Sequence, residues 1–306
     1  MKNFLSFFLF CLCTYYASSQ ETSLVRIGGI RPQWIDNPYS IYGKEEFITA
    51  VGQGENIDWA MYNAMSSLVG FFGRRIIQID DDNYIFENAY DHIIGAEITA
   101  IWDDAKGTVY ALATVNKDTL IDDYTTFAIK DSIIIDDLIT MSDEEKNSFN
   151  GYARLMEASC VAEDINNYLN ILKQAGQTWH TLENVDKYRN EARAILNNIP
   201  IQIICENDRY GRIQGAFTKV FSDRGFRTVR NNARYVLSVH FNALPGFNYT
   251  LLANLIDRTE NDIILYYNTF AKGINENDAI SVLEFNISQG FGQEFEDLLI
   301  SYIPEY

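Results

Sequence analysis

The chain has 306 residues, a formal net charge of −18, 47% hydrophobic residues and 14% aromatic residues. This length accommodates about two domains, and the apolar content is sufficient for packed cores, which excludes global disorder. Proteins bind nucleic acids and anionic membrane surfaces through clusters of lysine and arginine, so the acidic net charge argues against both as partners. Proteins, cations and neutral polymers remain as partner classes.

The first residues have the layout of a secretory signal peptide. Lys2 supplies a positive start, an apolar run extends from Phe4 to Tyr16, and Ala17-Ser18-Ser19 offers small residues for cleavage after Ser19. The run is too short to span a bilayer, and a buried N-terminal strand is the alternative interpretation. We expect residues 1–19 to be removed, which takes the net charge from −18 to −19. The expected location is the periplasm or the outer-membrane surface.

The cysteines argue against a lipid anchor. Cys11 and Cys13 both follow large apolar residues, whereas lipid attachment requires small residues directly before the cysteine. No later segment has the roughly 20 apolar residues of a membrane-spanning helix. Cys160 and Cys205 lie in patterns typical of a helix face and a strand. We expect both to be buried free thiols, although an oxidising compartment would also permit one disulfide.

Residues 20–116 are predicted to form a first α/β domain. An extended lead over Arg31–Ile35 precedes a strand over Phe47–Val51, which stops at Gly52-x-Gly54. An amphipathic helix follows, with apolar residues at spacings of three and four: Ile57, Ala60, Met61, Ala64, Met65, Leu68, Val69 and Phe72. Alternating apolar residues over 94–102 and 109–115 predict a β-hairpin with one buried face.

Residues 117–198 keep a helical period and are predicted to form a helical spacer. The run Ile133–Ile135 would also suit a strand. Ser142-Asp143-Glu144-Glu145 has the pattern of a capping box, so a new helix is expected to begin there and to end at Ala175-Gly176. A third helix is expected to carry apolar residues from Leu182 to Ile195.

Residues 199–306 are predicted to form a second α/β domain. A strand over 201–205, a helix over 213–221, four further strands and a last helix over 280–298 follow in order. The expected fold class is therefore α+β, with two small α/β domains that have mixed sheets and are joined by the helical spacer. Short segments at Gly52–Asn56 and Gly273–Asn277 both place glycine before a helix, with Asn56 or Asn277 as N-cap, which suggests two related units.

One pattern resembles a known family. Pro32-x-Trp34-Ile35, a strand, Gly52-x-Gly54 and a helix with Ala60-x-x-x-Ala64 together resemble the LPP-twenty lipoprotein family, over about residues 30–116. That family shares its small α/β domain with the N-terminal domain of the flagellar assembly protein T. The last third, with Gly273 at a strand end, resembles domains related to the curli-secretion lipoprotein G and the N-terminal domain of TolB.

The resemblance implies an envelope protein that binds or scaffolds other envelope proteins without enzymatic activity. Members are commonly lipoproteins, and this chain departs from them by lacking a lipid-attachment motif. The matched residues are structural by their chemistry: glycine allows tight backbone turns, alanine permits close helix packing, and tryptophan fills the edge of a core. These residues are Pro32, Trp34, Gly52, Gly54, Ala60, Ala64 and Gly273.

No catalytic or metal-ligating constellation emerges, and we expect no cofactor. Gly52-x-Gly54 lacks the third glycine of a dinucleotide loop, because Ile57 holds that position. Asp80–Asn83 fails the EF-hand pattern and fits a solvated acidic turn. The three histidines have no partners at ligand spacing: His92, His180 and His240. A pair of catalytic carboxylates stays open, because its geometry is invisible in a sequence.

The sequence therefore predicts a non-catalytic exported envelope protein, a scaffold or adaptor that engages other envelope proteins or its own copies. The alternative is a protein that binds the cell wall, or that binds or processes carbohydrate, through aromatic and acidic residues. Exposed aromatic side chains clustered beside a groove would favour this alternative, whereas scattered buried aromatics would favour the first prediction.

Overall fold

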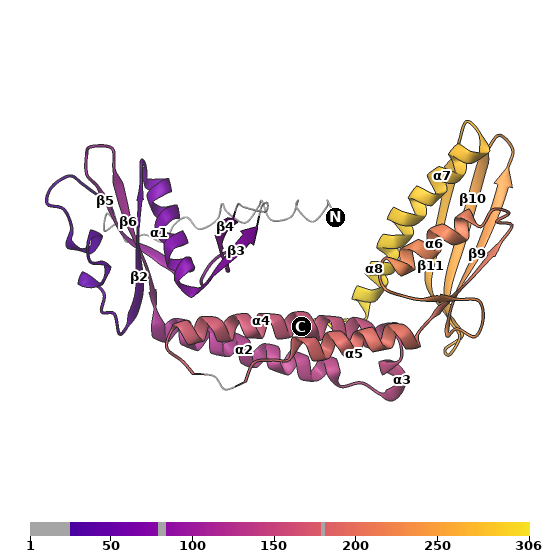
Figure 1. Ribbon diagram of the computed structural model, residues 1–306, viewed down its shortest axis with the longest axis horizontal. Helices are drawn as coiled ribbons and strands as arrows, with labels where there is room; N and C mark the ends of the chain where they lie inside the picture. Colours follow the sequence, from indigo (N-terminus) through magenta and orange to yellow (C-terminus); the bar gives the residue numbers. More distant parts are fainter. Residues whose placement is uncertain (1–24, 79–83, 179–180) are drawn as a thin grey trace. The chain divides into compact units, whose positions relative to one another are not determined.

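The computed structural model describes residues 25–78, 84–178 and 181–306 (Figure 1). The predicted leader with its two cysteines, the acidic run at 80–83 and His180 lie outside these residues. The chain divides into two compact units. Unit 1 contains the described residues up to Tyr124 and the segment Asn170–Thr178, and unit 2 contains Thr125–Leu169 and the residues from 181 onward. Both units carry a mixed sheet, and the predicted α+β class is confirmed.

Unit 1 is built on a four-stranded sheet of order β1-β5-β6-β2. Its strands are β1 (Val25–Ile27), β2 (Phe47–Gly54), β5 (Glu97–Asp103) and β6 (Val109–Asn116). β5 and β6 form the predicted hairpin, but β5 begins at Glu97 and not at Ile94. The chain turns at Gly95, where φ is +77°, and the Ile94 N–H donates to the hydroxyl of Tyr124 at 3.2 Å. Ile94 is therefore held in the turn that leads into the strand.

The two faces of this sheet are covered differently. Helix α1 (Ile57–Phe72) packs on one face (Figure 1). A segment with two 3-10 turns, η1 (Gln33–Ile35) and η2 (Pro38–Ser40), packs on the other. The lead into the strand is thus not extended throughout as expected: Pro32 is extended, and the chain then turns at Gln33–Ile35. Trp34, only 5% exposed, packs in this segment against Trp102 and Leu112.

Sequence analysis missed a second hairpin in unit 1, formed by β3 (Arg74–Gln78) and β4 (Tyr84–Asn88). In the sequence, apolar residues flank an acidic run, which is a hairpin signal. Each strand has five residues and, within the described part of the chain, pairs with the other strand alone, so the alternation is too short to separate from a loop.

The helical period of the middle section is confirmed in four helices: α2 (Lys117–Ile139), α3 (Asp143–Lys146), α4 (Phe149–Gln174) and α5 (Val185–Asn198). The capping box is present, because the Glu145 N–H donates to Ser142 Oγ at 3.3 Å and the Ser142 N–H donates to Glu145 Oε2 at 2.8 Å. It opens a single turn and not a long helix, since α4 begins anew at Phe149. Leu182 is exposed and lies before α5. No described helix is both long and apolar enough to span a membrane.

Unit 2 carries a five-stranded sheet of order β11-β10-β9-β7-β8. The strands are β7 (Ile201–Glu206), β8 (Thr228–Val229), β9 (Tyr235–Leu244), β10 (Asn248–Asp257) and β11 (Asp262–Lys272). β7 runs parallel to β8 and β9, and the last three strands form an antiparallel meander. Helical segments cover one face (Figure 1): α6 (Arg212–Ser222), α7 (Glu276–Asn286), the π-helical turn η3 (Ile287–Phe291) and α8 (Gly292–Ser301).

Buried aromatic side chains fill the space between this sheet and its helices, mostly edge to face: Phe149, Phe217, Phe221, Phe226, Tyr235, Phe291 and Phe295. Phe149, the first residue of α4, stacks on Tyr235 with ring centroids 3.7 Å apart, and its N–H donates to the Tyr235 hydroxyl at 3.1 Å. Burial raises the pKa of this hydroxyl. The start of α4 is therefore anchored in the core of unit 2.

A buried ion pair reinforces this anchor. Arg234 donates from Nε and Nη2 to the carboxylate of Asp257, with Nη2–Oδ2 at 2.7 Å. It also donates from Nη1 to the carbonyl oxygens of Glu144 and Asn147, at 3.3 and 3.0 Å. Arg234 thereby joins β9, the end of β10 and the α3–α4 connection.

Candidate functional site

The structure gives the predicted glycines of β2 a different role from the one expected. Neither Gly52 nor Gly54 has a positive φ, so neither makes the tight turn that was predicted. A methyl group added at Gly52 would lie 2.0 Å from the backbone nitrogen of Ala64, and one added at Gly54 would lie 2.5 Å from that of Ala60. Ala60 and Ala64 are fully buried. These four residues together bring the backbone of α1 directly onto the strand.

Gly273 occupies the matching position before α7. A methyl group there would lie 2.4 Å from the backbone nitrogen of Ala279. The N-cap is Asn275 and not Asn277: Asn275 Oδ1 accepts from the N–H three residues on at 2.9 Å, as Asn56 Oδ1 does before α1. Asn277 instead accepts from Arg212. The shared junction is therefore Gly-x-Asn-x-x-x-Ala in both units.

The predicted structural residues form no common site. Pro32 and Trp34 lie on the opposite sheet face from α1, and Gly273 belongs to unit 2. Their positions support packing roles rather than ligand binding.

The expectation of two buried thiols is wrong for Cys160. The buried positions of α4 recur at Leu155, Ala158, Ser159 and Ala162, and Cys160 lies one residue outside this stripe and is exposed. Cys205 is half-buried, and burial raises the pKa of its thiol to about 12. Both cysteines are free. Among the described residues, no group of three or more histidine, cysteine and acidic side chains could hold a metal ion.

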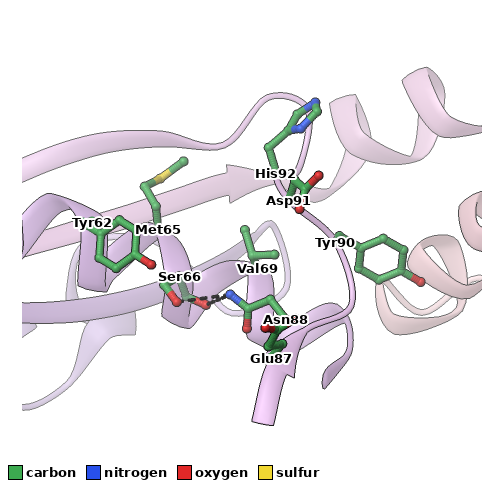
Figure 2. A pocket seen from close by; sticks show the side chains of 9 residues that line it. All are labelled: Tyr62, Met65, Ser66, Val69, Glu87, Asn88, Tyr90, Asp91 and His92. Carbon is green, nitrogen blue, oxygen red and sulfur yellow. Dashed lines mark hydrogen bonds between the residues drawn. The ribbon is translucent and has the colours of Figure 1, made fainter. Parts of the chain in front are cut away.

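A hollow of about 460 Å³ lies in unit 1 between α1 and residues 87–92, and we call it the α1 hollow (Figure 2). Its lining comprises Tyr62, Met65, Ser66, Val69, Glu87, Asn88, Tyr90, Asp91 and His92. Asn88 Nδ2 donates to the carbonyl oxygen and the hydroxyl of Ser66, at 3.0 and 3.1 Å, and so ties the end of β4 to α1. Glu87, Asp91 and His92 are exposed along the open side.

Two exposed aromatic residues stand at this hollow. Tyr62 is 64% exposed and lines it, and Trp59 is 57% exposed and packs edge-on against Tyr62, with ring centroids 5.8 Å apart at 89°. Sequence analysis did not assign a site here. The sequence did contain a sign of such a site: both aromatic residues lie outside the apolar stripe of the amphipathic helix, at positions that normally hold polar residues.

A second concave surface lies in unit 2 between α6 and α7, and we call it the α6–α7 groove. It measures about 510 Å³ and is lined by Arg212, Gly215, Ala216, Lys219, Val220, Glu284, Phe285 and Ser288. Phe285 is 66% exposed, and a methyl group at Gly215 would contact nothing within 4 Å. Arg212 ties the two helices together, with Nε 2.8 Å from Glu284 Oε1, and this contact raises the pKa of Arg212.

Comparisons with known proteins give superpositions at low scores only. No protein-family model and no curated protein matches the chain. A secreted protein of Helicobacter pylori superposes with a TM-score of 0.43 and 13% identity, over 85% of this chain and 99% of that one. A candidate lipoprotein of Caulobacter crescentus gives a TM-score of 0.20 and 11% identity, over 34% and 87%. Scores this low establish neither a shared fold nor a function, so the LPP-twenty resemblance stays an expectation.

Proposed function

We propose that this chain is a non-catalytic exported protein of the cell envelope that engages a protein partner through the α6–α7 groove. The observation that carries the proposal is the groove itself, where a large aromatic side chain, Phe285, stands in solvent beside an open glycine and apolar neighbours. Concave apolar surfaces between two helices accept an apolar anchor from a partner segment.

The charge of the chain favours a particular kind of partner. With 42 acidic and 24 basic residues, the protein attracts basic surfaces over long range. Apolar contact in the groove would supply most of the affinity, and charge would set the association rate. The partner is therefore expected to place an apolar side chain in the groove and a basic surface beside it.

A binding role without catalysis is supported by the chemistry of the perturbed groups. Several of those in unit 2 serve structural contacts: Asp257 pairs with Arg234, Arg212 pairs with Glu284, and the Tyr306 hydroxyl donates to Asp137 Oδ2 at 2.7 Å. Burial, and after it this hydrogen bond, raises the pKa of Tyr306 to about 12. These contacts join elements of the protein to one another, which is a structural use of a perturbed group.

The test places a photo-crosslinking residue at position 285 of the full chain. The variant is expressed in the bacterium that naturally produces the protein, so that its envelope partners are present. A covalent partner is expected from position 285 and not from position 300, because Ile300 is an exposed apolar residue of the same unit outside the groove. With the purified partner, Phe285→Ala should weaken binding by about thirtyfold, as truncation of an anchor of about 2 kcal/mol does. Ile300→Ala should leave binding unchanged.

Equal crosslinking from positions 285 and 300, or equal affinity of both variants, would refute the groove as the partner site. Hydrolysis of a peptidoglycan or glycan substrate by the purified chain would refute the non-catalytic assignment.

A further inference from the structure

We propose that the α1 hollow in unit 1 binds a neutral saccharide. This inference goes beyond partner binding at the α6–α7 groove, because it concerns a different unit, different residues and a different class of ligand.

The first argument is the exposed aromatic pair. Trp59 and Tyr62 leave more than half of their surface in water, although large aromatic rings gain most from burial. Their edge-to-face contact at 5.8 Å holds the ring of Tyr62, which lines the hollow, against the ring of Trp59. A ring face held open in this way is available to the apolar C–H face of a pyranose ring, since the negative face of the aromatic attracts C–H groups.

The second argument is the chemistry of the polar lining. The carboxylates of Glu87 and Asp91 border the hollow, and the exposed Asp91 accepts hydrogen bonds, so it suits a ligand that donates. Hydroxyl groups of a sugar donate and accept, and the Tyr62 hydroxyl and the His92 ring complement them. The same carboxylates repel phosphate and other anions, as does the net charge of −18. A neutral polyhydroxyl compound therefore fits best.

The third argument is that the walls are fixed before a ligand arrives. The two hydrogen bonds from Asn88 to Ser66 hold the β4 end against α1. On its other side α1 is seated on β2 at Gly52 and Gly54, where the backbones touch. A hollow of about 460 Å³ has the size of small-ligand sites, and pre-formed walls reduce the entropy lost on binding.

The experiment is isothermal titration of the full mature chain with two neutral probes, the tetramer of N-acetylglucosamine and cellotetraose. At least one probe should bind, and Tyr62→Ala and Trp59→Ala should each weaken that binding by tenfold or more. The matched control is Phe71→Ala, because Phe71 is an exposed aromatic of the same helix that does not line the hollow and that packs on Phe72, whereas Trp59 packs on the lining residue Tyr62. It should bind like the wild type, and Asp91→Asn should weaken binding less than the aromatic variants.

Absence of binding by both neutral probes at millimolar concentration would overturn the proposal, as would equal binding by Tyr62→Ala and wild type. Binding of an oligolysine peptide instead of either saccharide would also overturn it and would assign the hollow to a cationic ligand. Thermal melting of each variant excludes unfolding as the cause. Loss of partner crosslinking at position 285 is measured separately, so the two proposals fail independently.

Discussion

Gly52 is the residue at which unit 1 has the least room. Because an added methyl group would meet the backbone of α1 at 2.0 Å, Gly52→Ala must push the helix away from the sheet. We expect a loss of about 3 kcal/mol in the free energy of unfolding, the upper part of the range for overpacking. Gly43→Ala is the matched control, since Gly43 has open space and no positive φ. Chemical denaturation should give a clearly lower midpoint for Gly52→Ala than for Gly43→Ala. Equal midpoints would contradict the close approach of the α1 backbone to β2.

Trp34 tests the other face of the same sheet. It is almost fully buried against Trp102 and Leu112, so Trp34→Ala should cost about 3–5 kcal/mol of stability. The control is Trp59→Ala, which removes a tryptophan of the same unit that is largely exposed and should leave the denaturation midpoint nearly unchanged. If Trp34→Ala also left the midpoint in place, Trp34 would be a surface anchor and not a core residue.

Asp257 should make unit 2 sensitive to acid. Burial by itself would raise the pKa of its carboxyl, but hydrogen bonds from Arg234 and from the Thr259 N–H outweigh burial and lower it. The folded state therefore binds this proton less readily than the unfolded state, whose pKa is about 3.9. The stabilisation is complete above that value and is lost as the pH falls through the lower folded-state pKa.

Asp257→Asn provides the measurement. It leaves the half-buried Arg234 without its counter-charge, so it should cost about 1.5–3 kcal/mol at pH 7 and flatten the decline of stability below about pH 4. Asp36→Asn removes a carboxylate from an exposed pair with Arg31 and should leave stability at pH 7 nearly unchanged. An unaltered acid profile in Asp257→Asn would show that another group controls it.

At the scale of elements, the long periodic segments could be predicted and the short aperiodic ones could not. The stripe of α1, the β5–β6 hairpin and the capping box at Ser142 each carry a local signal, and each is present. The turn η1 and the hairpin β3–β4 depend on packing or pairing that a local pattern does not contain. The length of α3 likewise depends on Phe149 inserting into a distant core.

The candidate sites were less predictable than the elements for a related reason. The glycines of β2 were predicted to allow a tight turn, but their contacts depend on which strand atoms face Ala60 and Ala64, and that is set by packing. The α1 hollow unites residues of α1 with residues 87–92, whose hairpin was not predicted. The α6–α7 groove unites helices that lie more than 50 residues apart in the chain. Sequence periodicity contains no information on such pairings.

At the scale of the whole molecule, two separate cores remain a prediction that proteolysis can test. Exposed connections follow α2 near Met141–Ser142 and follow α4 near Ala175–Gln177. Limited proteolysis should cut first at one of these places and leave fragments that contain intact sheets. Early cuts confined to residues 47–115 would contradict this organisation, because they would mean that the sheet of unit 1 opens before the connections do.

The net charge also makes the mode of assembly measurable. Copies with a charge of −18 or more repel each other, so any self-association must come from apolar surface and should strengthen as salt rises. Association with a basic partner should instead become slower and weaker as the salt concentration rises. Light scattering from low to moderate salt, with the protein alone and with its purified partner, distinguishes the two. A salt-independent monomer that binds no partner would contradict assembly as the function.

The junction shared by β2–α1 and β11–α7 has a practical consequence for protein engineering. Its seven positions reverse the direction of the chain without any residue of positive φ. The glycine leaves room for the helix backbone, the asparagine side chain caps the start of the helix, and the alanine adds only a methyl group. The same three residues at these spacings occur in sheets of different strand order, so the junction is a local feature and does not depend on one topology. Gly-x-Asn-x-x-x-Ala can therefore be used in protein design as a strand-to-helix connection that packs the helix tightly on the strand before it.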